Sequence, residues 1–322
     1  MTLDAAENPP PKSDRGAVAS ETRAIQLSLA AGIILLGIKS WAYFITRSQA
    51  IFSDALENVV NVLASAFALY AITLSHRPAD KEHPYGHGKV EFLSAGFEGG
   101  MILLAALIIG AQAILAIAHH KTPTDLDFGL ILVAIAMVAN GAVGGYLWLH
   151  GLRSGAIVLE AEGMHLASDA ITSAAVLIAL GLVRLTGQEW IDPAAAIGVA
   201  IYIIWLGWGL VRRSSEGLMD KQDAADTVLL RTILESHMGP SGREPHICSF
   251  HKLRHRHSGR YHWVDFHMRV PRTWDIEKAH AAASAIEYEI EQALGDGDAT
   301  AHIEPCEQAD CPRCKGNCQR PD

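Results

Sequence analysis

The segment IFSDALENVVN, residues 51–61, places four polar side chains inside a stretch that is otherwise apolar enough to span a membrane. Their spacing of i, i+3, i+4 and i+7 puts them on one stripe of a helix. A charged residue at the centre of a bilayer costs at least ~2.5 kcal/mol, so we interpret the stripe as a functional site. Its members are Asp54, Glu57, Asn58 and Asn61.

The composition is that of a membrane protein, because 50% of the residues are hydrophobic and the mean hydropathy is +0.17. Six apolar blocks are each about long enough for a helix to cross ~30 Å of hydrocarbon. Only helices satisfy all their backbone groups within one segment in lipid, so we predict an all-α bundle of six transmembrane helices. The blocks lie at residues 24–45, 50–74, 91–118, 128–150, 156–184 and 190–211.

Positive charges predict the orientation of the bundle. Ten Lys and Arg residues flank the blocks on one side, against three on the other. By the positive-inside bias both termini are cytoplasmic, and we expect a multi-pass protein of the cell (inner) membrane. The richer side carries Lys12, Arg15, Arg23, Arg77, Lys81, Lys89, Arg153, Arg212, Arg213 and Lys221, and the poorer side Arg47, Lys121 and Arg184.

The chain divides into four segments by composition. Residues 1–23 are polar and lack the apolar core of a signal peptide, so we expect a disordered cytoplasmic tail. Residues 24–213 form the transmembrane domain, 214–305 a His-rich cytoplasmic domain and 306–322 a Cys-rich tail. The net charge of -9 argues against a nucleic-acid partner, which would require a basic face.

The cytoplasmic segment is expected to fold as a small α/β domain. The alternation in VDFHMRV favours a strand, and the apolar spacing in IEKAHAAASAIEYEIEQAL favours a helix. The expected order is αββαβ, as in ferredoxin-like metallochaperones. The elements are a helix at 223–237, strands at 246–255 and 260–270, a helix at 274–294 and a strand at 300–304.

A second polar pair lies in the fifth block, where GMHLASDAI contains His165 and Asp169 at i and i+4. If this pair faces Glu57 and Asn61, four ligands can surround a transition metal tetrahedrally. Two carboxylates neutralise a divalent cation, and protons compete for the same groups, which favours exchange of metal for protons. For Asp54 and Asn58 two roles stay open, support of the ligands or ordinary interhelical hydrogen bonding.

The loop between the second and third blocks, HRPADKEHPYGHGKVEF, offers another set of ligands. It contains Asp80, His83 and His87 within eight residues, around a turn at Gly86. Two imidazoles and a carboxylate at this spacing indicate an exposed metal site.

These features together resemble the cation diffusion facilitator family of divalent-metal/proton antiporters. The resemblance rests on the six spans, the loop PADKEHPYGHGK, the pair in HLASD and the small C-terminal domain, and covers residues 24–305. It implies a homodimer in membrane lipid that exports zinc, manganese, iron or cobalt from the cytoplasm in exchange for protons. It implies a transporter and not an enzyme, which agrees with the lack of an HExxH motif.

The resemblance also assigns sites. It places the transport site on Glu57, Asn61, His165 and Asp169 and a second site on the loop. It implies a salt bridge between Lys89 and the aspartate of GLMD, Asp220, that joins the two domains. It further implies a regulatory cytoplasmic site, where bound metal would hold two protomers together, made of His251, His267, His280, His302 and Glu304.

One position departs from the family pattern. In zinc-transporting members the second span supplies His or Asp and then Asp, whereas this chain has Glu57 and Asn61. An amide oxygen binds hard cations better than zinc, which favours manganese or iron, while His165 favours zinc, iron or cobalt. Zinc stays the first candidate for the transported ion because it is the commonest substrate of the family.

The tail CEQADCPRCKGNC groups four cysteines at a spacing that matches no standard zinc finger. In a reducing cytoplasm they indicate either thiolate metal binding or an inert tail. They are Cys306, Cys311, Cys314 and Cys318. A metal-gated channel or a metal-sensing membrane protein is the alternative to an antiporter for the chain as a whole.

Overall fold

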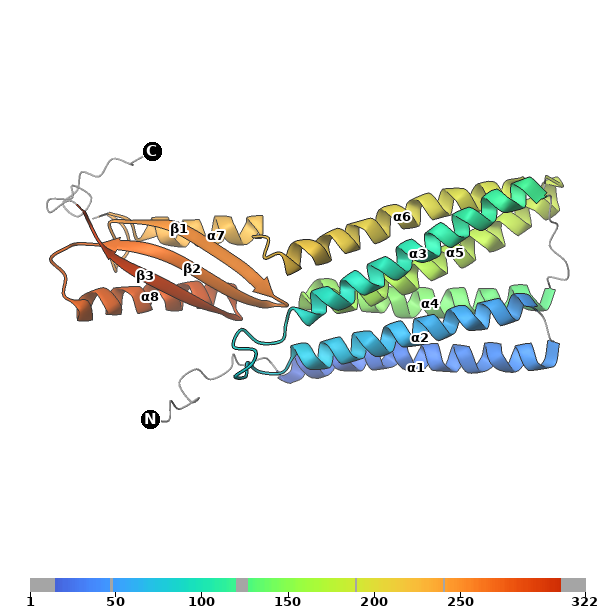
Figure 1. The fold of residues 1–322 in the computed structure, drawn as a ribbon, viewed down its shortest axis with the longest axis horizontal. Coiled ribbons are helices and arrows are strands. Elements are labelled where there is room, and N and C mark those ends of the chain that lie inside the picture. The colour runs from blue at the N-terminus through green and yellow to red at the C-terminus, as the bar shows by residue number, and fades with distance from the viewer. Residues whose placement is uncertain (1–14, 47–48, 120–126, 189, 240, 308–322) are drawn as a thin grey trace. The chain divides into compact units, whose positions relative to one another are not determined.

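The computed structural model describes residues 15–46, 49–119, 127–188, 190–239 and 241–307, which form a helical unit that ends at Leu218 and a C-terminal unit that begins at Met219 (Figure 1). The helical unit contains six long helices, which confirms the expected bundle. They are α1 (Arg15–Thr46), α2 (Gln49–Ser75), α3 (Val90–His119), α4 (Asp127–Ser154), α5 (Ile157–Thr186) and α6 (Ile191–Leu218).

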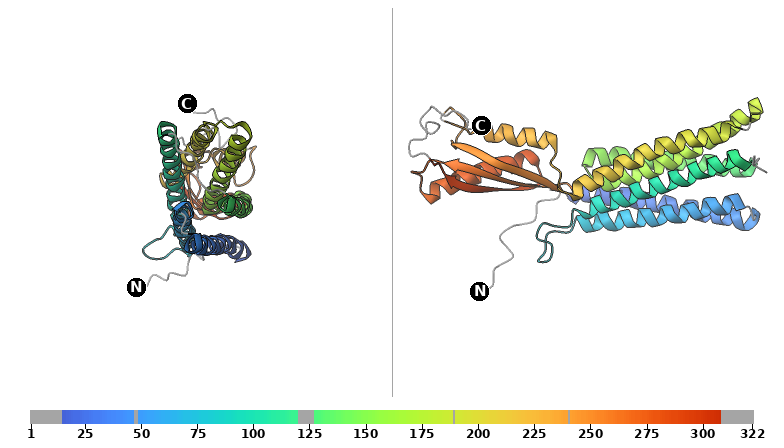
Figure 2. Two further views of the ribbon diagram at one scale, coloured as in Figure 1. Left: turned by 90° about the vertical axis from the view of Figure 1, so that its right-hand side faces the viewer. Right: turned by 45° about the horizontal axis from the view of Figure 1, so that its top comes forward.

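Helix α5 occupies a central position, because it contacts each of the other five helices. The most extensive contacts join α3 to α6, α4 to α5 and α1 to α2. Figures 1 and 2 show α1 beside α2 and α3 beside α6 along most of their length. Buried apolar residues of α5 belong both to a core shared with α1, α2 and α4 and to a core shared with α3 and α6.

Glycines lie where neighbouring helices approach each other closely. A Cβ atom added to Gly144 of α4 would lie 2.9 Å from the carbonyl oxygen of Gly163 on α5. In the same way a Cβ atom on Gly99 of α3 would lie 3.2 Å from the carbonyl oxygen of Gly207 on α6. Small residues of this kind let helix backbones approach one another in membranes, where no hydrophobic effect drives helices together.

Three helices contain a described stretch that is long and apolar enough to cross a membrane, Val18–Trp41, Val90–Leu115 and Ala194–Leu218. A shorter apolar stretch, Asn61–Ser75, lies in α2. The candidate ligands of the transport site are on α2 and α5, where these polar residues interrupt the apolar pattern.

The C-terminal unit has the expected order αββαβ. Its elements are α7 (Ala224–Ser236), β1 (Ser249–Ser258), β2 (Tyr261–Val270), α8 (Ile276–Leu294) and β3 (Gly297–Pro305). The sheet order is β1-β2-β3, with β1 antiparallel and β3 parallel to β2.

The described helices α7 and α8 cover one face of this sheet. Residues Val264, Phe266, Met268 and Val270 alternate along β2 and pack in one core with apolar residues of α7 and α8. Because successive side chains of a strand point to opposite faces, the residues between them lie on the other face. The sheet therefore has a helix-covered face and a second face that no described helix covers, which we call the uncovered face.

Two segment boundaries differ from the sequence expectation. The tail expected at residues 1–23 is helical from Arg15 onward, where the buried carboxylate of Glu21 lies 2.9 Å from Nε2 of His76 and ties α1 to the end of α2. Helix α6 continues through Leu218, beyond the expected boundary at residue 213. There the hydroxyl of Ser214 donates to the carbonyl of Phe92, so the polar end of the helix stays packed on α3.

Strand limits shift by a few residues as well. β1 begins at Ser249 and not at residue 246, and it continues to Ser258, where the tight connection to β2 begins. β3 begins at Gly297, three residues before the expected start at 300, because its pairing with β2 extends back to His262.

Candidate metal sites

Asn61, His165 and Asp169 lie together between α2 and α5. The amide nitrogen of Asn61 donates to Oδ2 of Asp169 over 2.7 Å, and its Oδ1 lies 3.1 Å from Nε2 of His165. A carbonyl oxygen only accepts, so Nε2 carries the hydrogen in this arrangement. Asn61 therefore holds both α5 side chains by hydrogen bonds that a metal ion would have to replace.

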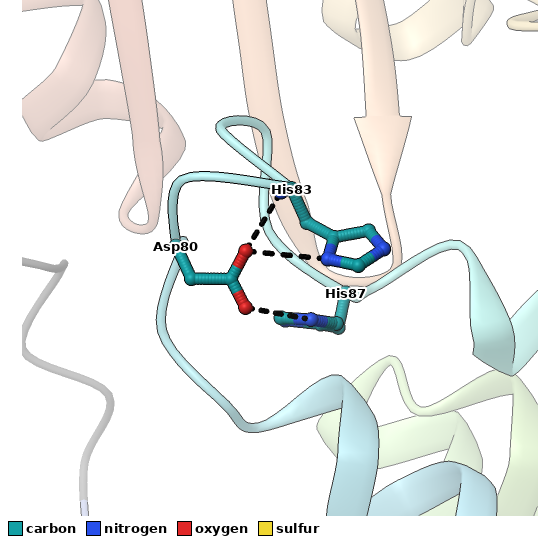
Figure 3. Close-up of side chains that lie close together, drawn as sticks. All are labelled: Asp80, His83 and His87. Atoms are coloured by element: carbon teal, nitrogen blue, oxygen red, sulfur yellow. Dashed lines mark hydrogen bonds and ion pairs between the residues drawn. The ribbon is translucent and has the colours of Figure 1, made fainter.

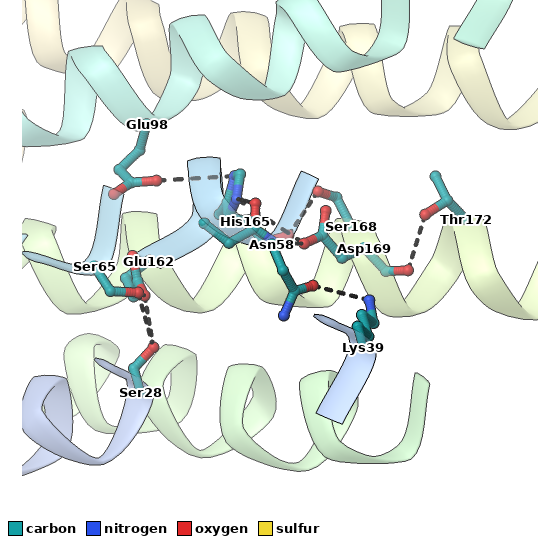
Figure 4. Close-up of polar contacts among 11 residues, drawn as sticks. Ser28, Lys39, Asn58, Ser65, Glu98, Glu162, His165, Ser168, Asp169 and Thr172 are labelled. Carbon is teal, nitrogen blue, oxygen red and sulfur yellow. Dashed lines mark hydrogen bonds and ion pairs between the residues drawn. The ribbon is translucent and has the colours of Figure 1, made fainter. Parts of the chain in front are cut away.

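Glu98 of α3 faces the other nitrogen of the same imidazole (Figure 4). Its Oε2 lies 3.8 Å from Nδ1 of His165. Glu98 is completely buried, and among the described residues neither its two carboxylate oxygens nor Nδ1 of His165 has a hydrogen-bond partner. Burying a charge without a partner is expensive, so this position suits a bound cation or proton. We call Asn61, Glu98, His165 and Asp169 the His165 cluster.

Glu162 adds another buried carboxylate on α5. Its Oε1 accepts hydrogen bonds from Ser65 and, over 2.6 Å, from Ser28. Its Oε2 has no hydrogen-bond partner among the described residues. Sequence reasoning missed Glu98 and Glu162, although Glu162 precedes His165 by three residues and so shares its helix face.

A buried lysine lies close to these carboxylates. Lys39 of α1 donates to Oδ1 of Asn58 over 2.8 Å and is only 5% exposed. This contact gives Asn58 an interhelical hydrogen bond, one of the two roles left open by the sequence. The lysine itself was not expected, since a single Lys within an apolar block carries no spacing signal.

A small cavity borders the cluster, with a volume of about 10 Å³. That is close to the space that one water molecule requires. The polar residues that line it come from α1, α2 and α4, and they are Ser28, Asn58, Asn61, Ser65 and Asn140. Apolar residues such as Leu35 and Leu166 complete the lining, so the space beside the cluster has both polar and apolar walls.

The expected ligands Glu57 and Asp54 belong to α2, but their side chains lie outside the described residues. Glu57 precedes Asn61 by four residues, so the two positions share a face of the helix. The ligand role of Glu57 stays a prediction, as does any role of Asp54.

The loop residues form a second group, which we call the Asp80 cluster (Figure 3). Oδ1 of Asp80 lies 3.2 Å from Nδ1 of His83, and Oδ2 lies 3.4 Å from Nε2 of His87. The backbone N–H of His83 donates to Oδ1 over 2.7 Å and lowers the pKa of the Asp80 carboxyl. Ligands ~2.0–2.1 Å from a tetrahedral zinc ion lie about 3.3–3.4 Å apart, so the spacing of this cluster fits such an ion.

Three expected ligands of the C-terminal unit come together on the uncovered face of the sheet, one from each strand. Oε1 of Glu304 lies 2.8 Å from Nδ1 of His267, and Oε2 lies 3.4 Å from Nε2 of His251. The hydrogen bond from His267 lowers the pKa of Glu304, and burial lowers the pKa of His251. Both effects favour the ligating form of the side chain. We call these three residues the Glu304 cluster.

The two other histidines expected in this site differ from each other. The ring of His302, on β3, lies 4.6 Å from that of His267, between centroids, and is within reach of the cluster. His280 is an exposed residue of α8, the helix that covers the opposite face of the sheet. The chain therefore does not bring His280 to the Glu304 cluster.

Two further expectations stay predictions. Lys89 and Asp220 belong to different units, and within its own unit Asp220 lies 3.6 Å from the guanidinium of Arg256. Cys306 is buried and its backbone N–H donates to Val270 over 2.9 Å. Its expected partners in metal binding, Cys311, Cys314 and Cys318, lie outside the described residues.

The chain matches two domain models of one family of known proteins. Residues 25–219 match the cation efflux transmembrane domain, and residues 241–306 match the cytoplasmic domain of cation efflux proteins. An uncharacterized transporter of Synechocystis sp., sll1263, is 37% identical over 87% of this chain and 89% of its own length.

Two further known proteins match the chain at lower sequence identity. The cation-efflux pump FieF of Escherichia coli is 27% identical over 88% of this chain and 93% of its own length. A solved structure of CzrB is 25% identical with a TM-score of 0.24, and the match covers 26% of this chain and 98% of that one. With a transmembrane match over more than half of its length, this chain belongs to the cation efflux, or cation diffusion facilitator, family of multi-pass membrane transporters.

Proposed function

We propose that this protein exports a divalent metal cation from the cytoplasm and imports protons in exchange. The observation that carries the proposal is the His165 cluster, in which an imidazole and a carboxylate of α5 meet an amide of α2 beside a buried carboxylate of α3. Ionisable residues inside a membrane bundle are expensive and mark ion pathways.

The same residues explain why metal and protons would exchange. A carboxylate or imidazole binds metal only in its deprotonated form, so metal binding releases protons and protons displace metal. Asp169, with Glu57 as the expected second carboxylate, neutralises a divalent charge. Glu98, which has no hydrogen-bond partner among the described residues, is the group that we assign to proton binding when the metal leaves.

For the transported ion we put zinc first, with manganese, iron and cobalt as the other candidates. His165 favours a borderline metal such as zinc, iron or cobalt. The amide of Asn61 in the ligand set favours harder cations such as manganese, so this residue is the one that we expect to set the ion preference.

The other clusters fit roles on the cytoplasmic side. With both termini in the cytoplasm, the loop of the Asp80 cluster faces the cytosol and can collect ions before transport. We assign the Glu304 cluster, with His302, to sensing cytosolic metal and to holding two protomers together. The working form is then a homodimer within membrane lipid.

Reconstitution into proteoliposomes tests the proposal directly. Metal uptake and internal pH are recorded together for zinc, manganese, iron and cobalt, and an antiporter should move protons in proportion to metal. Glu57→Gln and Asp169→Asn should abolish both signals. The matched control Glu216→Gln removes a carboxylate that pairs with Arg212 at the end of α6, and it should transport normally.

Two outcomes would contradict the proposal in different ways. Normal transport by both site variants would remove the His165 cluster as the transport site. Metal flux without a proportional movement of protons would indicate a channel.

A further inference from the structure

A separate cluster of ligating side chains lies on the helix-covered face of the C-terminal sheet. Oδ2 of Asp226, in the first turn of α7, lies 2.9 Å from Nε2 of His257 and 3.2 Å from Nδ1 of His262. The three ligand atoms all lie within 4.8 Å of one another. We call these residues the Asp226 cluster.

The three side chains of this cluster come from three elements, α7, β1 and β2. His257 and His262 are cross-strand partners at the hairpin between β1 and β2, with ring centroids 4.2 Å apart. His262 is two residues from the core residue Val264, so it points to the helix-covered face. Asp223 caps α7 and accepts hydrogen bonds from the backbone N–H groups of Ala225 and Asp226, which fixes the turn that carries the carboxylate.

A neighbouring contact holds α7 against the same hairpin. His255 lies two residues before His257 on β1, is 5% exposed, and has its Nε2 2.8 Å from the hydroxyl of Thr227. The cluster is therefore partly buried between elements whose positions are already fixed, and a ligand would not have to order a loop.

The spacing of the ligand atoms is similar to that in the Asp80 and Glu304 clusters. Ligands of a tetrahedral zinc ion lie about 3.3–3.4 Å apart, so separations of 2.9 and 3.2 Å need only small side-chain movements to admit the ion. Burial lowers the pKa of both His262 and His255, which favours the neutral imidazole. The carboxylate lies in the first turn of a helix, where negative charge is favoured.

We propose that Asp226, His257 and His262 bind a divalent transition metal ion of the zinc class, with water as the fourth ligand. This site is distinct from the Glu304 cluster, which uses the uncovered face of the same sheet. A metal ion here joins the first turn of α7 to the hairpin, so the cytoplasmic domain binds cytosolic metal on both faces. The inference goes beyond the proposed function and does not require transport.

The test counts zinc bound to the full-length protein in detergent after equilibration with free zinc and removal of the excess. His262→Gln and Asp226→Asn should each lower the zinc content by about one ion per protomer. The matched control is His246→Gln, because His246 is in the same domain and lies 3.7 Å from the carboxylate of Glu244. An unchanged zinc content in both site variants, or an equal loss in the control, would overturn the proposal.

A second measurement uses the unaltered chain and so does not depend on the folding of a variant. Histidine modification by diethyl pyrocarbonate is followed at each site by mass spectrometry, with and without zinc. At a free zinc concentration about ten times the dissociation constant, His257 and His262 should react about tenfold more slowly, and His246 at an unchanged rate. Equal modification of His257 and His262 with and without zinc would show that the cluster only ties α7 to the hairpin by hydrogen bonds.

Discussion

The His165 and Glu304 clusters use similar side chains in opposite surroundings. In the Glu304 cluster each carboxylate oxygen faces an imidazole, and the ligands stand on adjacent strands at a partly exposed surface. In the His165 cluster the side chains come from three helices, the amide of Asn61 joins two side chains of α5, and the carboxylate of Glu98 is completely buried.

In the function that we propose, this difference distinguishes a binding site from a transport site. At the exposed cluster, water can replace a departing metal ion with little cost. At the buried cluster the charge left behind must be neutralised, and protons are the available cations. We therefore expect metal occupancy to depend strongly on protons in the membrane and weakly on protons in the cytoplasmic domain.

The largest expected effect comes from His165→Gln, which removes the imidazole at the centre of the buried cluster. Metal flux in proteoliposomes should fall to the background of empty vesicles, while zinc binding by the Glu304 cluster stays unchanged. Flux and zinc titration measured on one preparation check both parts. Retained flux would mean that the imidazole is not a ligand.

Glu98→Gln is expected to slow transport about tenfold, a typical loss when a supporting group of a metal site is removed. Because the amide cannot take up a proton, the rate should also depend less on pH. The matched variant Glu98→Asp keeps the titrating group and should recover the pH dependence. If the pH profiles of Glu98→Gln and the parent coincide, Glu98 does not bind the exchanged proton.

Asn61→Asp is expected to change which ion is preferred more than it changes folding. A carboxylate in place of the amide should raise the ratio of zinc to manganese transport about tenfold. Uptake of each ion, measured in competition, checks this ratio, and thermal unfolding of the variant provides the control. An unaltered ion ranking would remove Asn61 as the residue that sets preference.

Glu304→Gln should weaken zinc binding to the cytoplasmic domain about tenfold, because the carboxylate contacts both imidazoles of its cluster. Transport at saturating metal should change less than about twofold, since the buried ligands are untouched. Titration calorimetry and flux measurements separate the two effects. A parallel loss of transport would show that the cytoplasmic site is part of the ion pathway.

The smallest effect concerns pH. Burial lowers the pKa of His251, and the hydrogen bond from His267 lowers that of Glu304. Both ligands then keep their metal-binding form as pH falls to the ordinary histidine value of ~6.5, and lose it only below their lowered pKa values. The contribution of His251 to any loss of zinc affinity between about pH 7.5 and 6.5 should therefore be less than about twofold, as measured by titration of the parent and of His251→Gln.

The sequence predicted the elements and brought together those candidate site residues that share a periodic pattern. His165 and Asp169 follow helical spacing and face Asn61, as expected from one turn of helix. Glu98 and Lys39 could not be found in this way, because each is a single polar residue in an apolar block and only helix packing brings it to the cluster.

The family resemblance did not show on which face of the sheet each histidine lies. It placed His280 with His267, but His280 is exposed on α8, which packs on the helix-covered face, whereas the side chain of His267 lies on the other face. The burial of His255 against α7 likewise carried no signal in the sequence. Asp226 offered no signal, because it is far from these histidines in sequence.

The glycine contacts carry a mechanical consequence. Where Gly144 meets Gly163 and Gly99 meets Gly207, the helix backbones are in close contact, and we expect these helix pairs to stay together when the bundle changes shape. Helices α4 and α5 should then move as one rigid body and α3 and α6 as another. The ligands of α5 would travel with α4, away from or toward Asn61 on α2 and Glu98 on α3, so each ion released would be accompanied by a sliding movement at these looser interfaces.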